Sequence, residues 1–259
     1  MKKILFNILI CSGLLALASC EKKVTTEDPS TITYYVQFEM NGDKTMYVPL
    51  NSTFTDPGVV ATENGVDVND KVKVSIVDAS GAAVDAISTD GPGMYTMTYS
   101  AINSDGFSAS SSRTVFVYDP TVTMSMAGTY NADMTLSLYG TKGKTFADYA
   151  PSYGFTNECT GITFTELCPG FYYCNDILGG WYDQIRGFGV SYNAMMGKMT
   201  GYVSLNADST LTLLSSHINA WDDGLDYMDN SSFDPATGVV TYHVLYGGSV
   251  HVTPYLVKQ

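Results

Sequence analysis

Hydrophobic and polar residues alternate in short runs along the first half of the chain. Val72, Val74 and Ile76 are separated by single polar residues, and the same spacing returns over residues 95–99. A period of two is typical of a half-buried β-strand, because successive side chains of a strand point to opposite faces. Short strands separated by frequent turns predict a β-sandwich over residues 32–119. The turn sequences are Asn41-Gly42, Asp56-Pro57-Gly58, Asn64-Gly65, Ser80-Gly81, Gly91-Pro92-Gly93 and Asp105-Gly106.

A domain boundary is expected at Asp119-Pro120, since proline cannot donate to a strand ladder and restricts the residue before it. Over residues 120–259 the composition shifts towards Gly, Tyr and Met, and strand-like runs continue without helical crossovers. This pattern predicts an antiparallel meander, closed as a lipocalin-like β-barrel or folded as a second sandwich, so the fold class is all-β. Residues 141–158 alone are expected to hold a short helix or a long loop. The predicted strands are Met134–Leu138, Gly161–Glu166, Gly170–Cys174, Trp181–Ile185, Gly187–Tyr192, Gly201–Leu205, Leu211–Ser215, Val239–Tyr246 and Val250–Leu256.

The chain begins with a segment of a different kind. Lys2 and Lys3 precede an apolar stretch over residues 4–17, which small residues follow. A basic start, a short apolar core and small residues at the cleavage point are typical of an export signal. The apolar stretch is short for a helix that spans a bilayer. We therefore predict a signal peptide over residues 1–19.

Cys20 closes the sequence Leu17-Ala18-Ser19-Cys20, which resembles a bacterial lipobox. The resemblance implies that Cys20 is acylated, with chains such as palmitate, and becomes the first mature residue. The membrane is then a partner through this lipid, and residues 20–31 form a polar tether. Glu21 follows Cys20 where an aspartate is sometimes linked with inner-membrane retention, which favours the outer membrane, on its surface or its periplasmic face. An ordinary secretory leader with an unrelated cysteine is the alternative.

The chain is strongly acidic, with 13 lysines and arginines against 26 aspartates and glutamates and a net charge of −13. Removal of residues 1–19 takes away two lysines and no acid, so the mature charge is −15. A chain of this charge without a basic cluster repels phosphate backbones, and we expect no nucleic-acid partner. It also repels anionic lipid surfaces, which leaves membrane attachment to the acyl chains of Cys20.

Many residues between Phe54 and Val117 match one family pattern. The matching residues are Phe54, Asp56-Pro57-Gly58, Ala61, Gly93, Tyr95, Tyr99, Ala101, Gly106, Ala109, Arg113, Val115 and Val117. With them the segment resembles the bacterial immunoglobulin-like repeats of cell-surface proteins. It departs from the pattern at Asn103 and Phe107, which both fall on a turn. The resemblance implies an Ig-like domain over residues 32–119 that acts as a spacer, with a binding role as the alternative.

The order of the segments also resembles outer-membrane lipoproteins of gut anaerobes that accompany glycan importers. In these proteins a lipidated leader, an Ig-like spacer and a C-terminal β domain follow one another. Gly128-Thr129-Tyr130 and residues 234–238 are similar to short motifs of their C-terminal domains. The resemblance implies a glycan ligand and outer-membrane transporter proteins as partners.

The two tryptophans of the chain each stand beside aspartate, in Trp181-Tyr182-Asp183 and in Trp221-Asp222-Asp223. Sugars present apolar C–H faces ringed by hydroxyl groups, so their sites use flat aromatic surfaces beside carboxylate or amide acceptors. We therefore predict that Trp181, Tyr182, Asp183, Trp221, Asp222 and Asp223 contact a ligand. The alternative is that each tryptophan plugs the core or the rim of the β domain.

Other residue clusters do not reach a recognisable catalytic or metal-binding pattern. Cys159, Cys168 and Cys174 lack zinc-site spacing, and at most one disulfide is expected, Cys159–Cys168 across a hairpin, although spacing does not decide the pairing. Aspartates over residues 222–229 do not follow the EF-hand pattern and are expected to form a solvated loop. His243 and His251 lie in predicted strands, facing outward if the apolar residues face the core and into a barrel lumen if the sense is reversed. No G-x-S-x-G motif, phosphate-binding loop or dinucleotide fingerprint occurs, so no cofactor is expected.

These observations predict a non-enzymatic, lipid-anchored cell-envelope protein that binds carbohydrate through its C-terminal β domain during glycan uptake. Three alternatives stay open. The protein could be a structural or adhesive surface protein that binds other envelope proteins, or a barrel that encloses a small apolar ligand. A glycoside hydrolase is the third, since paired carboxylates can perform that reaction.

Overall fold

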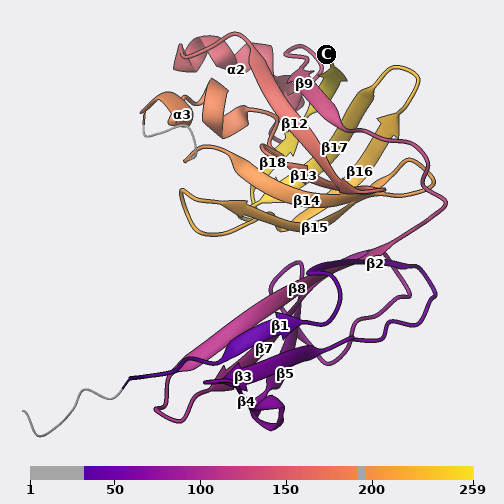
Figure 1. Ribbon diagram of the computed structural model, residues 1–259. Helices are drawn as coiled ribbons and strands as arrows, with labels where there is room; N and C mark the ends of the chain where they lie inside the picture. The colour runs from indigo at the N-terminus through magenta and orange to yellow at the C-terminus, as the bar shows by residue number, and fades with distance from the viewer. Residues whose placement is uncertain (1–31, 192–195) are drawn as a thin grey trace, which may run out of the picture. The chain divides into compact units, whose positions relative to one another are not determined.

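The computed structural model describes residues 32–191 and 196–259. The predicted signal peptide, Cys20 and the tether lie outside the described residues. The chain divides into a short unit, Met1–Tyr34, and a large unit, Tyr35–Gln259. The large unit carries an Ig-like β domain and a C-terminal β domain, each shown in Figure 1. The prediction of an all-β fold with an N-terminal Ig-like domain is confirmed.

The Ig-like domain consists of two sheets. The larger has the order β2-β8-β7-β5-β6, in which β2 and β8 are parallel and the other neighbours antiparallel. The smaller has the order β1-β3-β4. The elements are β1 (Gln37–Met40), β2 (Thr45–Pro49), β3 (Val59–Glu63), β4 (Val66–Asp67), the 3-10 turn η2 (Asn69–Lys71), β5 (Lys73–Asp78), β6 (Ala83–Val84), β7 (Gly93–Ile102) and β8 (Ser108–Tyr118).

On the two long strands of this domain, β7 and β8, the predicted alternation correctly identifies core residues. Met97 and Tyr99 of β7 and Val115 and Val117 of β8 are buried in one cluster. The alternation is weaker on β5, where Val74 is half-exposed. Burial on one face of each long strand is what binds the two sheets into a sandwich.

Arg113 is fully buried, and its guanidinium donates hydrogen bonds to residues of two turns. Its Nη1 donates to Asp56 Oδ1 at 2.8 Å, and its Nη2 donates to the carbonyl oxygen of Asn41 at 2.6 Å. The Tyr99 hydroxyl donates to the same Asp56 oxygen. A buried charge is stable only with such partners, so Asp56, Tyr99 and Arg113 are required together.

The C-terminal domain is one strongly curved antiparallel sheet with helical segments at one end. The ladder order is β11-β10-β18-β17-β19-β9-β12-β13-β14-β15, and β16 pairs with β17 outside this path. The elements are β9 (Gly128–Ala132), β10 (Leu138–Tyr139), β11 (Lys144–Thr145), α2 (Phe146–Tyr153), β12 (Cys159–Cys168), β13 (Phe171–Cys174), η3 (Trp181–Ile185), α3 (Phe188–Ser191), β14 (Met199–Leu205), β15 (Leu211–Ile218), β16 (Tyr227–Asp234), β17 (Val239–Tyr246), β18 (Val250–Thr253) and β19 (Tyr255–Lys258).

The sheet curls until β15 approaches β16, but no ladder joins these two strands in the described part of the chain. The Ser231 hydroxyl of β16 bridges the gap instead, accepting from Leu211 N at 2.8 Å and donating to Leu211 O at 2.9 Å. Phe233 N also donates to Ser209 O at 2.8 Å. The domain therefore differs from the closed barrel that was one of the two predicted forms, because side-chain and turn hydrogen bonds replace main-chain pairing at this seam.

Side chains fill the interior of the curved sheet. Tyr130, Tyr172, Tyr242, Phe164 and Met199 are fully or almost fully buried there. The Tyr242 hydroxyl donates to the carbonyl oxygen of Ile177 at 2.9 Å, so the polar end of this large side chain is satisfied. These residues occupy the space that a small apolar ligand would need.

Three local predictions from the sequence are wrong. Trp181–Ile185 is a turn of π-helix rather than a strand, and the described part of Gly187–Tyr192 contains the helix α3. Met134–Leu138 is mostly turn. In contrast, the short helix expected within residues 141–158 is present as α2, and Thr145 and Asp148 form a capping box at its start.

The expected Cys159–Cys168 disulfide is also wrong. The two cysteines lie at opposite ends of the single strand β12, about 30 Å apart at the usual rise per residue. A disulfide needs Cα atoms within about 7 Å. Cys159, Cys168 and Cys174 are all free and buried. Burial raises the pKa of the Cys168 thiol to about 12, so this thiol is protonated at neutral pH.

Candidate functional site

The helical segments α2, η3 and α3 gather at one end of the C-terminal domain, as Figure 1 shows for α2 and α3. Gly179 and Gly180 begin this region with φ angles of 62° and 88°, a conformation that favours glycine. A Cβ on Gly180 would lie 2.8 Å from the Cys159 sulfur, so the chain turns here only because both residues lack side chains. The turn directs the chain into η3, where the first predicted site residues lie.

Trp181 is fully buried and forms the centre of an aromatic cluster. The ring of Tyr139 stacks on it with centroids 3.7 Å apart and planes 15° apart. Phe146, Tyr149 and Tyr153 from α2 surround the remaining edges. Because Tyr139 covers its face, the indole has the position of a core residue rather than of a stacking platform.

Tyr182 and Asp183 are also buried. The predicted site residues 181–183 therefore lie inside the domain, whereas residues 221–223 begin with an exposed tryptophan. The Tyr182 ring packs against Phe188 of α3, with centroids 5.6 Å apart and nearly parallel planes. The Arg186 guanidinium lies 5.4 Å from the centre of Tyr182 and 5.3 Å from that of Phe188. Cation–π attraction of this kind holds a guanidinium over the face of an aromatic ring. Tyr182 and Phe188 form the floor beneath Trp221.

Trp221 is 46% exposed and lies on that floor. Its ring centroid is 5.2 Å from that of Tyr182, 5.6 Å from that of Phe188 and 6.1 Å from that of Tyr246. A surface hollow of about 220 Å³ lies beside it, lined by Phe188, Met196, Ala220 and Trp221. The indole is therefore fixed from below and open to solvent, which is what a stacking platform for a ligand requires.

The aspartates after Trp221 have different environments. The side chain of Asp222 is almost fully exposed, 3.8 Å from His217, and its backbone is left-handed with φ 55°. Asp223 accepts a hydrogen bond of 2.9 Å from the Tyr246 hydroxyl. Burial and this carboxylate raise the pKa of Tyr246, so the phenol keeps its proton and continues to donate. Asp222 is therefore a solvent-exposed acceptor next to Trp221 in the chain, while Asp223 holds the Tyr246 hydroxyl.

A pair of buried carboxyl groups lies beneath the site. Asp176 is almost completely buried and accepts hydrogen bonds from Leu178 N at 3.2 Å and Gly180 N at 3.1 Å. Burial, together with the neighbouring charge of Asp183, raises the pKa of Asp176 to about 7. Burial also raises the pKa of Asp183, which Lys198, 4.0 Å away, opposes. Asp183 Oδ1 has no hydrogen-bond partner among the described residues.

Sequence reasoning missed Phe188, Arg186 and Tyr246 as parts of the Trp221 platform. Tyr246 ends a predicted strand, and Phe188 was placed in a strand that is in fact helical. Tyr246 reaches Trp221 from β17, whereas Arg186 and Phe188 come from η3 and α3, and no local pattern encodes the approach of these segments to the loop after β15.

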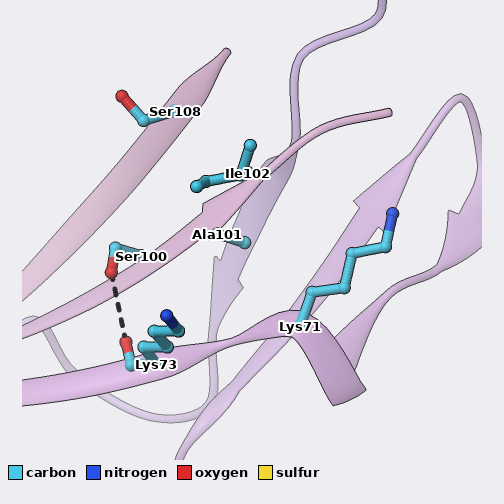
Figure 2. Close-up of a pocket in the computed structure, with 6 residues that line it drawn as sticks. All are labelled: Lys71, Lys73, Ser100, Ala101, Ile102 and Ser108. Atoms are coloured by element: carbon cyan, nitrogen blue, oxygen red, sulfur yellow. Dashed lines mark hydrogen bonds between the residues drawn. The ribbon is translucent and has the colours of Figure 1, made fainter. Parts of the chain in front are cut away.

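A second surface hollow, of about 490 Å³, lies on the Ig-like domain, lined by residues from the start of β5, the end of β7 and the start of β8 (Figure 2). Ala101 and Ile102 contribute apolar atoms to its lining, and Lys71 and Lys73 contribute basic side chains. Lys71 is paired with Glu63 at 3.2 Å, and Ser100 Oγ donates to the Lys73 carbonyl oxygen. Its lining contains no aromatic ring, so it lacks the flat surface that a sugar face requires.

The acidic residues over 222–229 are engaged individually rather than converging on one point. Asp226 accepts from Gly248 N at 2.7 Å, and Asp229 contacts His243. Within residues 32–191 and 196–259, no three His, Cys, Asp or Glu side chains are grouped so that they could hold a metal ion. In the same ranges no helix is long and apolar enough to cross a bilayer.

Comparison with known proteins adds to this geometry. Residues 38–117 match the family model of a bacterial surface protein Ig-like domain. Residues 119–257 match a second family model, which describes a C-terminal domain. The solved structure of the lipoprotein BT2262 from Bacteroides thetaiotaomicron is 31% identical, over 87% of this chain and 100% of that chain, with a TM-score of 0.43. The chain belongs to the BT2262-like lipoprotein family. Family membership and the surface Ig-like domain indicate a cell-envelope location.

Two further comparisons do not extend the BT2262-like assignment. The solved structure of CBM51-2 in complex with GlcNAc and INT domains, from Clostridium perfringens ZmpB, is 12% identical over 86% of this chain and 44% of that chain. Its TM-score is 0.25, which is too low to carry an argument. A search of curated proteins gives no match.

Proposed function

We propose that this BT2262-like protein is a non-enzymatic outer-membrane lipoprotein, anchored through Cys20, that binds carbohydrate with its C-terminal domain during glycan uptake. Its relative BT2262 is described as a lipoprotein, which supports acylation of Cys20 here. The Ig-like domain acts as a spacer between the anchor and the binding domain. Outer-membrane transporter proteins are the proposed partners.

The observation that carries the proposal is the half-exposed Trp221 on its aromatic floor. An indole held in one orientation loses little conformational freedom when a ligand stacks on it, so more of the contact energy appears as affinity. Asp222, exposed beside it, can accept hydrogen bonds from hydroxyl groups at the edge of a stacked sugar. Trp181 is buried under Tyr139 and is not part of the proposed contact surface.

Affinity electrophoresis in gels with embedded polysaccharides tests this proposal, after a glycan array has selected the ligand. We expect Trp221→Ala to weaken retention about 30-fold or more, because removal of a central aromatic contact costs about 2 kcal/mol or more. Tyr227→Ala is the matched control, since Tyr227 is an aromatic residue of similar exposure in the same domain. The control should keep wild-type retention.

Thermal unfolding of the same variants separates binding from folding. The proposal requires Trp221→Ala to melt near the wild-type temperature, because the indole is half exposed. A folded Trp221→Ala protein with unchanged retention would exclude Trp221 as the platform.

A structural or adhesive role, in which the two β domains bind other envelope proteins, is the second candidate. The half-exposed Tyr35 and Phe107 of the Ig-like domain, 5.7 Å apart between ring centroids, support it, since aromatic residues are enriched in protein interfaces. Failure to bind any glycan on an array, together with a stable protein partner in pull-downs, would favour this role. Release of reducing sugar from mixed polysaccharides would instead indicate a glycoside hydrolase.

A further inference from the structure

A line of three polar side chains crosses neighbouring strands on the outer face of the C-terminal sheet. Asp229 of β16 stands directly opposite His243 of β17, and His251 of β18 lies diagonally beyond it. His243 Nδ1 is 2.6 Å from Asp229 Oδ1, and His243 Nε2 is 3.0 Å from His251 Nδ1. Buried Tyr242 and Val244 flank His243 in sequence, so the histidines face outward, as the alternation predicts.

The carboxylate determines how His243 presents its other nitrogen. A carboxylate can only accept, so Asp229 favours the tautomer in which Nδ1 carries the hydrogen and Nε2, which faces His251, carries the lone pair. Metal-binding histidines have this arrangement, in which a carboxylate on one ring nitrogen fixes the tautomer and raises the basicity of the other. The two facing nitrogens are 3.0 Å apart. Two nitrogens each about 2.0–2.1 Å from one metal ion are about 2.9 Å apart at a right angle and about 3.4 Å apart at a tetrahedral angle.

We propose that His243 Nε2 and His251 Nδ1 form a surface site for a first-row divalent cation such as Zn²⁺, Ni²⁺ or Cu²⁺, with Asp229 as the positioning residue. The two ring planes are 19° apart with centroids 5.3 Å apart, and a hydrogen bond now joins the two nitrogens. The metal ion replaces the hydrogen of this bond while the proton of His251 moves to its Nε2. Each ring rotates so that the two lone pairs converge, and water completes the coordination sphere. Imidazole ligands suit these ions better than they suit Ca²⁺ or Mg²⁺.

The third histidine of the chain supplies a matched control. His217 is exposed on β15, hydrogen-bonded to Asn219 and 3.8 Å from Asp222, with no second histidine beside it. Zn²⁺ is titrated calorimetrically into the mature chain and into variants, with circular dichroism as the check on folding. We expect one Zn²⁺ per chain, affinity reduced at least tenfold in His243→Ala and in His251→Ala, and no change in His217→Ala.

Asp229→Asn tests the positioning role separately, because it retains both ring nitrogens. Loss of such a carboxylate partner weakens metal binding about 10- to 100-fold. His251→Gln keeps a polar side chain at the surface, and we expect it to bind Zn²⁺ as weakly as His251→Ala. Titration with Mg²⁺ should give no binding at this site. Absence of Zn²⁺ binding to the wild type, or binding that His217→Ala reduces and His251→Ala does not, would overturn the proposal.

Discussion

Asp176 shows how one buried residue links the candidate site to the stability of its domain. Its two oxygens accept the N–H groups that hold the turn at residues 178–180, and that turn positions η3 and the floor of the Trp221 platform. The carboxyl group does this in an environment that disfavours its charge, and its pKa is about 7. Ionisation of Asp176 therefore lowers the free energy of unfolding relative to the protonated form.

The pH dependence follows from this shift. The pKa of Asp176 is higher in the folded chain than the ordinary 3.8, so the folded state binds more protons between about pH 4 and pH 7. Over this window stability falls as the pH rises, by up to about 1.4 kcal/mol per pH unit for one proton, and above pH 7 the contribution is constant. Carboxyl groups with lowered pKa, such as Asp133 and Asp148, act in the opposite sense, but below about pH 4.

We expect Asp176→Asn to flatten the stability profile between pH 4.5 and 7.5, measured by urea unfolding. The amide loses one acceptor, so the variant is less stable in absolute terms, but the slope reports the titration. Asp222→Asn is the control, because the Asp222 side chain is almost fully exposed and asparagine tolerates its left-handed backbone. An unchanged slope in Asp176→Asn would show that another group carries the pH dependence.

Among the elements, the seam between β15 and β16 is the place where the curved sheet depends on a side chain. The other strand junctions along the ladder path are main-chain ladders, whereas this seam is made by the Ser231 hydroxyl on Leu211 and one main-chain hydrogen bond from Phe233 N to Ser209 O. Local opening of a fold occurs where few main-chain hydrogen bonds must break. The seam is therefore the expected site of the first opening of this domain.

Ser231→Ala is predicted to destabilise the domain by about 1 kcal/mol, because it leaves the Leu211 N–H and C=O without their partner. Amide hydrogen exchange should accelerate along residues 211–218 and 227–234 and stay unchanged on β12 and β13. Ser232→Ala, one residue further along the same strand but exposed, is the comparison. Uniform acceleration over the whole domain would argue against the seam as a local opening point.

Strands in which apolar and polar residues alternate were predicted correctly from the sequence. The prediction failed where a short apolar run showed neither the strand nor the helix periodicity. Trp181, Tyr182, Asp183 and Ile185 are all buried, so no polar face marked them as helical, and short runs of this kind fit a strand equally well. The Ig-like domain was predictable because Asp56, Tyr99 and Arg113 form one network with a sequence signature. Trp221 was proposed as a ligand contact from the aspartates next to it in sequence, whereas its floor depends on contacts distant in sequence.

At the scale of the whole molecule, the proposed anchor at Cys20 and the binding surface at Trp221 lie in separate segments of the chain. Attachment and binding should therefore be separable by mutation. Charge supports this division, since a mature net charge of −15 gives the chain no attraction of its own to anionic lipid.

Cys20→Ala is expected to move the protein out of the membrane fraction without changing its glycan retention. The anchor would be lost because the acyl chains supply the apolar surface that holds the protein at the bilayer. Cell fractionation and intact mass, which records the added acyl chains, measure the first effect. Cys159→Ala controls for loss of a cysteine as such, and a membrane-bound Cys20→Ala protein would contradict the lipid assignment.

The two tryptophan environments also give the molecule two optical signals. The indole of Trp181 is sealed under Tyr139, while that of Trp221 is open to water, and the chain has no others. A collisional quencher such as iodide reaches only Trp221 in the folded protein. A sugar stacked on Trp221 would shield it and shift its emission to the blue, whereas unfolding would expose both indoles. Fluorescence can thus follow ligand capture and chain unfolding in one cuvette, without a label.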